Sequence, residues 1–139
     1  MQTKEVVNIF KGYLTAFEYY DLDKVAAYYH LPCTLHMPDK VVLLKNTQEC
    51  FQEFDGIFTQ LQQAKTSKII ARKASYSLIT DNLLIASIDW EFLDEQGEIF
   101  ADFCAIYHLV LINDELKIIN VVSHDLSNSL SLDFPFKLD

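Results

Sequence analysis

The sequence predicts an α+β fold in which three N-terminal helices pack on an antiparallel β-sheet. Helical periodicity is confined to the first 63 residues, and long strand-like runs fill most of 68–124. Helices followed by consecutive strands, rather than alternating with them, are typical of α+β domains. With 139 residues, the chain is expected to form one domain over 1–125, followed by an extended tail over 126–139.

The first predicted helix covers residues 3–20, where apolar side chains recur at the three-four spacing of one helical face: Val6, Ile9, Phe10, Tyr13, Phe17 and Tyr20. Asp21 is suited to cap a short second helix over 22–29, because its carboxylate can accept the free amides of the first turn. Pro32 is expected to end this second helix.

The third predicted helix begins after Asn46 or Thr47 and runs to about Gln63. Its buried stripe would consist of Phe51, Phe54, Ile57, Phe58 and Leu61. Two short strands, 33–37 and 41–44, are predicted before it, on either side of a turn at Pro38-Asp39.

The remaining strands differ in which faces are apolar. In 84–92 the even positions are apolar, whereas Ser87, Asp89 and Glu91 are polar, so only one face should be buried. The runs 103–112 and 116–124 are apolar on both faces and therefore need cover on both sides. The helices can cover one face, and a second subunit is expected to cover the other, which predicts a homodimer through the sheet.

The tail has an alternating pattern of its own. Apolar side chains occupy even positions, and mostly polar ones lie between them, which predicts an extended segment on an apolar surface of the body or of a partner subunit. Pro135 limits this segment to an edge strand, because proline cannot donate a ladder hydrogen bond.

Composition excludes several classes of function. The chain has 11 Lys and Arg against 20 Asp and Glu, a net charge of −9, which disfavours nucleic acids and anionic membranes. No apolar run is long enough to span a membrane, and the N-terminus does not resemble a signal peptide. The three scattered cysteines predict buried reduced thiols and a cytoplasmic location. No metal or cofactor is expected, because the four histidines lack ligand spacing.

Three stretches carry a family resemblance: Tyr20-Asp21-Leu22-Asp23 after the first helix, 28–33 with 37–42, and the closing hairpin 107–119. Over about residues 5–125 the chain resembles the NTF2-like superfamily, which includes SnoaL-type polyketide cyclases and ketosteroid isomerases, and in particular a branch of uncharacterised SnoaL-like proteins. The resemblance implies a cystatin-like cone, in which the helices close over a curved sheet and leave an apolar pocket. Because this fold carries many functions, the site must decide between them.

The resemblance to ketosteroid isomerases implies a role for Tyr13, which precedes Asp21 by the spacing of their oxyanion-binding tyrosine. A buried phenol can polarise a substrate carbonyl, but a core tyrosine with a satisfied hydroxyl is the favoured explanation of this position. The matching position of the catalytic base is Met37, and that of the second acid lies near Tyr107 or His108. The carboxylate pair is therefore missing, and His36 is left as an alternative base.

Asp89 and Asp102 form another candidate pair, because the hairpin at 94–97 brings them opposite or nearly opposite each other. Inside the pocket, two close carboxylates would raise one pKa and supply a general acid. On the solvent face they would be the polar side of amphipathic strands, which is the favoured interpretation.

We expect a protein that binds a small apolar molecule in the cone. One alternative is a lyase, isomerase or cyclase using Tyr13 with His36, Asp89, Asp102 or His108, and another is a non-catalytic assembly module. The predicted pocket residues are Tyr13, Phe17, Tyr28, His36, Phe54, Phe58, Trp90, His108 and Asn120.

Overall fold

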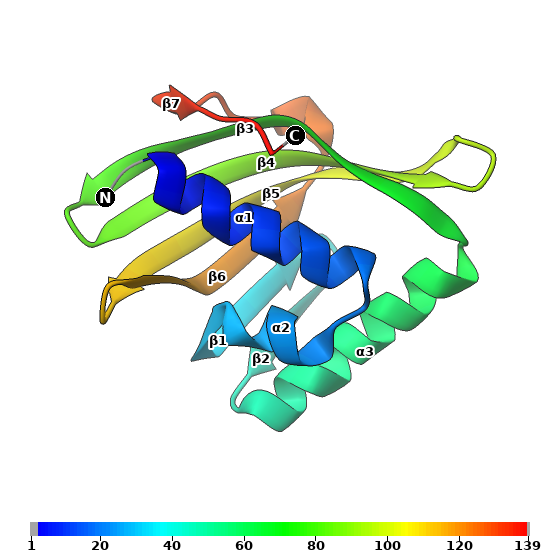
Figure 1. The fold of residues 1–139 in the computed structure, drawn as a ribbon, viewed down its shortest axis with the longest axis horizontal. Helices are drawn as coiled ribbons and strands as arrows, with labels where there is room; N and C mark the ends of the chain where they lie inside the picture. Colours follow the sequence, from blue (N-terminus) through cyan, green and yellow to red (C-terminus); the bar gives the residue numbers. More distant parts are fainter. Residues whose placement is uncertain (1–2, 139) are drawn as a thin grey trace.

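A computed structural model describes residues 3–138, in which three helices cover one face of a strongly bent sheet (Figure 1). The helices are α1 (Thr3–Glu18), α2 (Leu22–Ala27) and α3 (Thr47–Gln63), with a 3₁₀ turn, η1, at Leu126–Asn128. The strands are β1 (Tyr29–Met37), β2 (Lys40–Leu44), β3 (Thr66–Thr80), β4 (Leu83–Asp94), β5 (Ile99–Ile112), β6 (Glu115–His124) and β7 (Phe134–Pro135). They form one unclosed sheet in the order β2-β1-β6-β5-β4-β3-β7. The predicted α+β, cystatin-like fold is confirmed.

The helix boundaries follow the predicted caps. The Asp21 carboxylate accepts the Lys24 amide at 3.0 Å, and the Asn46 side chain accepts the Glu49 amide at 2.9 Å. Pro32 was expected to end α2, but that expectation is wrong: α2 ends at Ala27 and Pro32 lies inside β1. The register between β1 and β6 shifts between Tyr29 and Thr34, so the proline sits where the ladder is already interrupted.

The sheet is antiparallel except for the pairing of β1 with β6, which is parallel. The sequence pattern predicted an antiparallel sheet throughout. The difference arises because α3 and four strands lie between β1 and β6 in the chain, a connection long enough for a parallel pair. The turns carry the expected backbone: Gly97 has a φ of 77°, and Asn113 and Asp114 have φ values of 50° and 65°.

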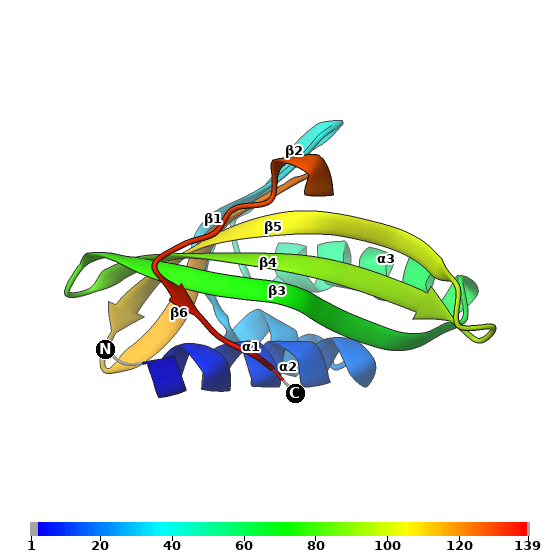
Figure 2. The same cartoon turned by 90° about the horizontal axis from the view of Figure 1, so that it is seen from above.

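The concave face of the sheet packs against α1 and α3 (Figures 1 and 2). On β4 the inward residues are those predicted from the alternation, and Ala86, Ile88 and Trp90 are buried. The apolar side of α1 meets them, with Val6 and Phe10 fully buried. Within residues 3–138, no helix is sufficiently long and apolar to cross a membrane.

The C-terminal tail lies on the chain's own sheet (Figure 2). The Ser129 hydroxyl donates to the Asp89 carboxylate at 2.6 Å, and the Leu132 amide donates to the Ser75 hydroxyl at 2.9 Å. β7 then pairs with the edge of β3, and the Phe136 ring stacks on Phe10 with ring centroids 6.0 Å apart. The tail therefore covers the outer face over β3–β5, crosses the sheet edge and ends in the core.

This course of the tail predicts a difference between its two phenylalanines. Phe136→Ala should lower the free energy of unfolding by about 3–5 kcal/mol, because it opens a cavity between Phe10 and Tyr76. Phe134→Ala is the matched control: its ring is 47% exposed, and its loss should cost about 1 kcal/mol or less. Urea denaturation followed by circular dichroism measures both, and equal costs for the two variants would contradict the anchoring role of Phe136.

Candidate functional site

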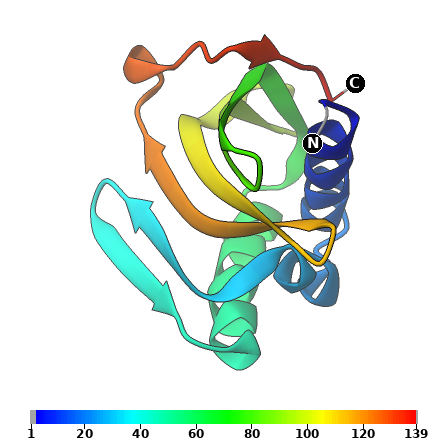
Figure 3. The ribbon, with the colours of Figure 1, turned by 90° about the vertical axis from the view of Figure 1, so that its left-hand side faces the viewer.

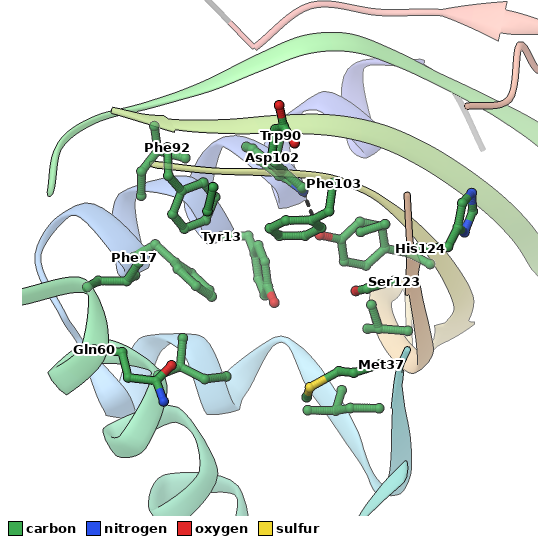
Figure 4. Close-up of a pocket in the computed structure, with 18 of the residues that line it drawn as sticks. Tyr13, Phe17, Met37, Gln60, Trp90, Phe92, Asp102, Phe103, Ser123 and His124 are labelled. Carbon is green, nitrogen blue, oxygen red and sulfur yellow. Dashed lines mark hydrogen bonds between the residues drawn. The ribbon is translucent and has the colours of Figure 1, made fainter. Parts of the chain in front are cut away.

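A cavity of about 690 Å³ lies between α1, α3 and the concave face of the sheet (Figure 4). The bent sheet diverges from the helices, and the side chains do not fill the space between them. The cavity wall is mainly apolar, and its aromatic side chains include Tyr13 and Phe17 from α1, Phe54 from α3, and Tyr29, Trp90, Phe92, Phe103 and Tyr107 from the strands. The site is therefore a largely apolar pocket whose few polar groups fix its chemistry.

Tyr13 and Tyr29 form the first polar element of the wall. Their hydroxyl oxygens are 2.7 Å apart and share one hydrogen bond, in which either can donate. Helical spacing places Tyr13 on the inward side of α1, and Tyr29 begins β1 directly after the short second helix. Both side chains are buried, and the Tyr13 hydroxyl points toward the centre of the cavity in Figure 4.

Tyr107 and Trp90 form the second polar element. The Trp90 indole Nε1–H donates to the Tyr107 hydroxyl at 2.9 Å across the β4–β5 pair (Figure 4). The Tyr107 ring stands 6.0 Å from the Tyr13 ring, centroid to centroid, in an edge-to-face arrangement. The three phenols therefore lie close together at one side of the cavity.

Burial keeps these phenols protonated. It raises the pKa of Tyr13, an effect that the hydrogen bond with Tyr29 only partly offsets. Burial also raises the pKa of Tyr29 and of Tyr107 well above the usual value. These groups can donate hydrogen bonds to a guest at neutral pH, but they are not bases.

The carboxylate and imidazole groups around the cavity lie at its rim. Asp102 is exposed, and Figure 4 shows its carboxylate turned away from the cavity, as the imidazole of His124 also is. His124 bonds the Asn128 carbonyl at 3.0 Å, and Asp125 accepts the Ser127 amide at 2.8 Å, which lowers the pKa of Asp125. The His36 ring bonds the Thr34 hydroxyl at 3.2 Å.

The structure does not bring Asp89 and Asp102 together in the cavity. Asp89 pairs with Cys104 and Asp102 with Glu91, so the two carboxylates are diagonal neighbours on the outer face. Asp89 is covered by the tail there, and one of its oxygens, Oδ1, has no hydrogen-bond partner among residues 3–138. The alternation of β4 decides this outcome, because Trp90 points inward and its neighbours must point outward.

Of the nine expected pocket residues, Tyr13, Phe17, His36, Phe54 and Trp90 line the cavity. The expectation is corrected for the other four. His108 and Asn120 lie on the outer face of the sheet, where they bond each other at 2.9 Å. The Tyr28 hydroxyl packs over Gly12 of α1, and Phe58 packs among Phe17, Tyr20 and Phe54, behind the cavity wall.

Sequence reasoning missed Tyr29, Gln60 and Ser123 as cavity residues. Ser123 points into the cavity in Figure 4. It could have been predicted, because it lies two residues after Val121 on the same strand and therefore on the same face. Gln60 stands at the mouth on α3, one helical turn from Ile57. Tyr29 carried no signal of its own, because it was assigned to the end of a helix.

The three cysteines are free and buried, and burial raises the pKa of Cys33 and Cys50 to about 11. Such thiols are protonated at neutral pH and are poor nucleophiles. Within residues 3–138, no three His, Cys, Asp or Glu side chains are grouped so as to hold a metal ion.

The raised pKa values predict how the tyrosines titrate. In a titration followed by phenolate absorbance, Tyr13, Tyr29 and Tyr107 should stay protonated at about pH 10, where exposed tyrosines ionise. The protonated phenols favour the folded state, and this contribution to the free energy of unfolding is fully present below the unfolded-state tyrosine pKa of about 10. It is lost as the pH rises from there through the higher pKa values of the folded state. These three should therefore ionise together with unfolding. Reversible ionisation of all seven tyrosines near pH 10 in a folded protein would contradict the enclosed phenol cluster.

Comparisons with known proteins place the chain in a family. A family model described as NTF2-like protein (DUF6841) matches residues 4–126. An NTF2-like protein of unknown function from Shewanella oneidensis superposes with a TM-score of 0.73 and 15% identity, covering 90% of this chain and all of the other. An NTF2-like protein with a cystatin-like fold from Novosphingobium aromaticivorans gives a TM-score of 0.75 and 9% identity, with coverages of 91% and 82%.

Aln2 from a Streptomyces species gives a TM-score of 0.70 and 12% identity, with coverages of 88% and 89%. No curated protein sequence matches the chain. At these identities the likeness to solved structures concerns the fold alone. The helix order, the bent sheet and the family match agree, and this chain belongs to the NTF2-like family DUF6841.

Proposed function

We propose that this protein binds a small, largely apolar molecule that carries a hydrogen-bond acceptor, such as a carbonyl oxygen, in the cavity between the helices and the sheet. The observation that carries the proposal is an aromatic cavity of about 690 Å³ with three phenols in its wall. Small-molecule sites usually have volumes of about 300–1,000 Å³ and a few convergent polar groups.

A count of phenolic protons supports an acceptor on the guest. The Tyr13–Tyr29 hydrogen bond uses one of the two protons of that pair, and Tyr107 accepts from Trp90 without using its own proton. Among residues 3–138, the second proton of the pair and the Tyr107 proton have no acceptor in the protein. An oxygen of the guest can accept both, because the raised pKa values keep the phenols protonated.

The positions of the carboxylates favour binding over isomerase or lyase chemistry. Proton transfer between carbon atoms needs a base beside the substrate. Asp102 turns away from the cavity in Figure 4, Asp125 is exposed and bonds the Ser127 amide, and Asp89 lies on the outer face. A guest held by Tyr13 and Tyr107 therefore meets hydrogen-bond donors but no carboxylate base.

Binding of a matched pair of probes tests this proposal. Methyl naphthyl ketone should bind about five to ten times more tightly than isopropenyl naphthalene, in which a methylene group replaces the carbonyl oxygen, because one hydrogen bond contributes about 1 kcal/mol. Trp90 is the only tryptophan and lies in the cavity wall, so its fluorescence reports occupancy.

Three variants control the experiment. Tyr107→Phe should reduce the preference for the ketone, because it removes one of the two phenolic donors, whereas Tyr76→Phe should keep it, because the Tyr76 hydroxyl bonds Thr3 outside the cavity. Ser123→Phe should fill part of the cavity and weaken both probes by about tenfold or more. Absence of binding by either probe, or binding unaffected by Ser123→Phe, would refute the proposal.

A further inference from the structure

The inner sides of β5 and β6 lead from the phenols to the mouth of the cavity; Figure 3 shows the two strands side by side. Two residues from Tyr107 along β5, Ala105 pairs with Ser123 of β6. One step beyond the last pair of this register, Phe103 and Asp125 stand at the same level, and both line the cavity. At about 3.3 Å per residue, this level lies about 13 Å from Tyr107 along the strand.

Aromatic rings surround the mouth on the side of the sheet. The Phe103 ring lies 5.7 Å from the Phe92 ring, and the Phe100 ring lies 6.2 Å from it, centroid to centroid. Phe92 is buried, Phe103 is half-buried and Phe100 is 39% exposed, so the rings extend from the interior to the solvent. Figure 4 shows Phe92 and Phe103 beside the cavity. The faces of such rings attract a positive charge.

The fixed charges of the lining are negative. Asp102 and Asp125 belong to it, and no Lys or Arg does within residues 3–138. Asp125 accepts the Ser127 amide, which lowers the pKa of its carboxyl and keeps it ionised at neutral pH. The whole chain carries a net charge of −9, and this field attracts cations and repels anions at the mouth.

The lysines closest in sequence to the lining do not offset this charge. Lys40 follows the lining residue Pro38 by two positions, and its ammonium group is paired with Glu53 at 3.7 Å. Lys68 precedes the lining residue Ile69 on β3, so the alternation of the strand turns it to the opposite face. A negatively charged guest would therefore find no partner at the mouth.

We propose that the guest is an ammonium-bearing molecule, whose acceptor oxygen lies against the phenols and whose positive charge lies at the mouth between Phe103 and Asp125. This inference rests on the proposed function and names the class of molecule that the cavity takes. The acceptor and the charge would be separated by about 10–13 Å. A flat ring system fits between them, because Ala105 and Ser123, at the intervening level, have small side chains.

Three naphthyl ketones of similar shape test the inference. They are (6-acetyl-2-naphthyl)methylammonium, 6-acetyl-2-naphthamide and 6-acetyl-2-naphthoate, and Trp90 fluorescence reports their binding. At low salt the ammonium compound should bind about five to ten times more tightly than the neutral amide, and the carboxylate about ten times more weakly. In 1 M salt the ratio of the two charged affinities should shrink, because the Debye length falls to about 3 Å.

Variants assign the effect to the mouth. Asp125→Asn should lower the ammonium-to-carboxylate affinity ratio by about threefold or more, and asparagine can still accept the Ser127 amide. Asp114→Asn is the matched control, because it removes one exposed carboxylate from the β5–β6 turn, where a φ of 65° also suits asparagine. Phe103→Leu should weaken the ammonium compound several-fold and change the affinity for the amide by less than about twofold.

The outcomes separate this inference from the proposed function, once circular dichroism has shown that the variants are folded. Equal affinities for the ammonium compound and the carboxylate would overturn the inference alone, because the cavity would still bind ketones. A ratio that falls in Asp114→Asn but not in Asp125→Asn would also overturn it. Absence of binding by all three compounds would overturn both the inference and the proposed function.

Discussion

The central strand pair β4–β5 must be covered on both faces, and the rest of the structure depends on how this is done. Its inner face is apolar throughout, with Ala86, Ile88 and Ala105 buried. Its outer face is buried at Ser87, Cys104 and Ile106. Removing such surfaces from water is the main source of stability, so cover on each side is required rather than optional. Helices α1 and α3 cover the inside, and the C-terminal tail covers much of the outside.

Incomplete cover on the inside produces the cavity. The bent sheet and the two straight helices diverge, and residues 3–138 place no further helix or strand between them. The aromatic rings pack edge to face around the space, which gives its wall a rigid shape. The same geometry draws Tyr13, Tyr29 and Tyr107 into apolar surroundings, where their pKa values rise. The packing that forms the cavity wall therefore also keeps these three phenols protonated, so that they can donate hydrogen bonds.

Local patterns in the sequence predicted what local physics decides. The three-four spacing of α1, the caps Asp21 and Asn46 and the alternation around Trp90 all correspond to the observed elements. Features set by non-local pairing were not predictable: the parallel β1–β6 ladder, and the outward position of His108 and Asn120. In a strand that is apolar on both faces, the alternation of side chains does not indicate which face is inward. The register with β4 assigns Tyr107 to the cavity and His108 to the outer face.

The two faces of the sheet therefore carry different polar chemistry. Inside, the hydroxyls of the phenol cluster are surrounded by aromatic rings and keep protons available for an acceptor. Outside, hydrogen bonds run from His108 through Asn120 and Thr34 to His36, and these partly exposed side chains connect β5, β6 and β1. Tyr107 and His108 are consecutive residues of β5, so a single strand supplies both sets. A substitution that shifted the register of β5 by one residue would exchange them, placing imidazole in the cavity and phenol on the outer face of the sheet. The register of β5 consequently determines which polar groups line the cavity and which lie on the outer face of the sheet.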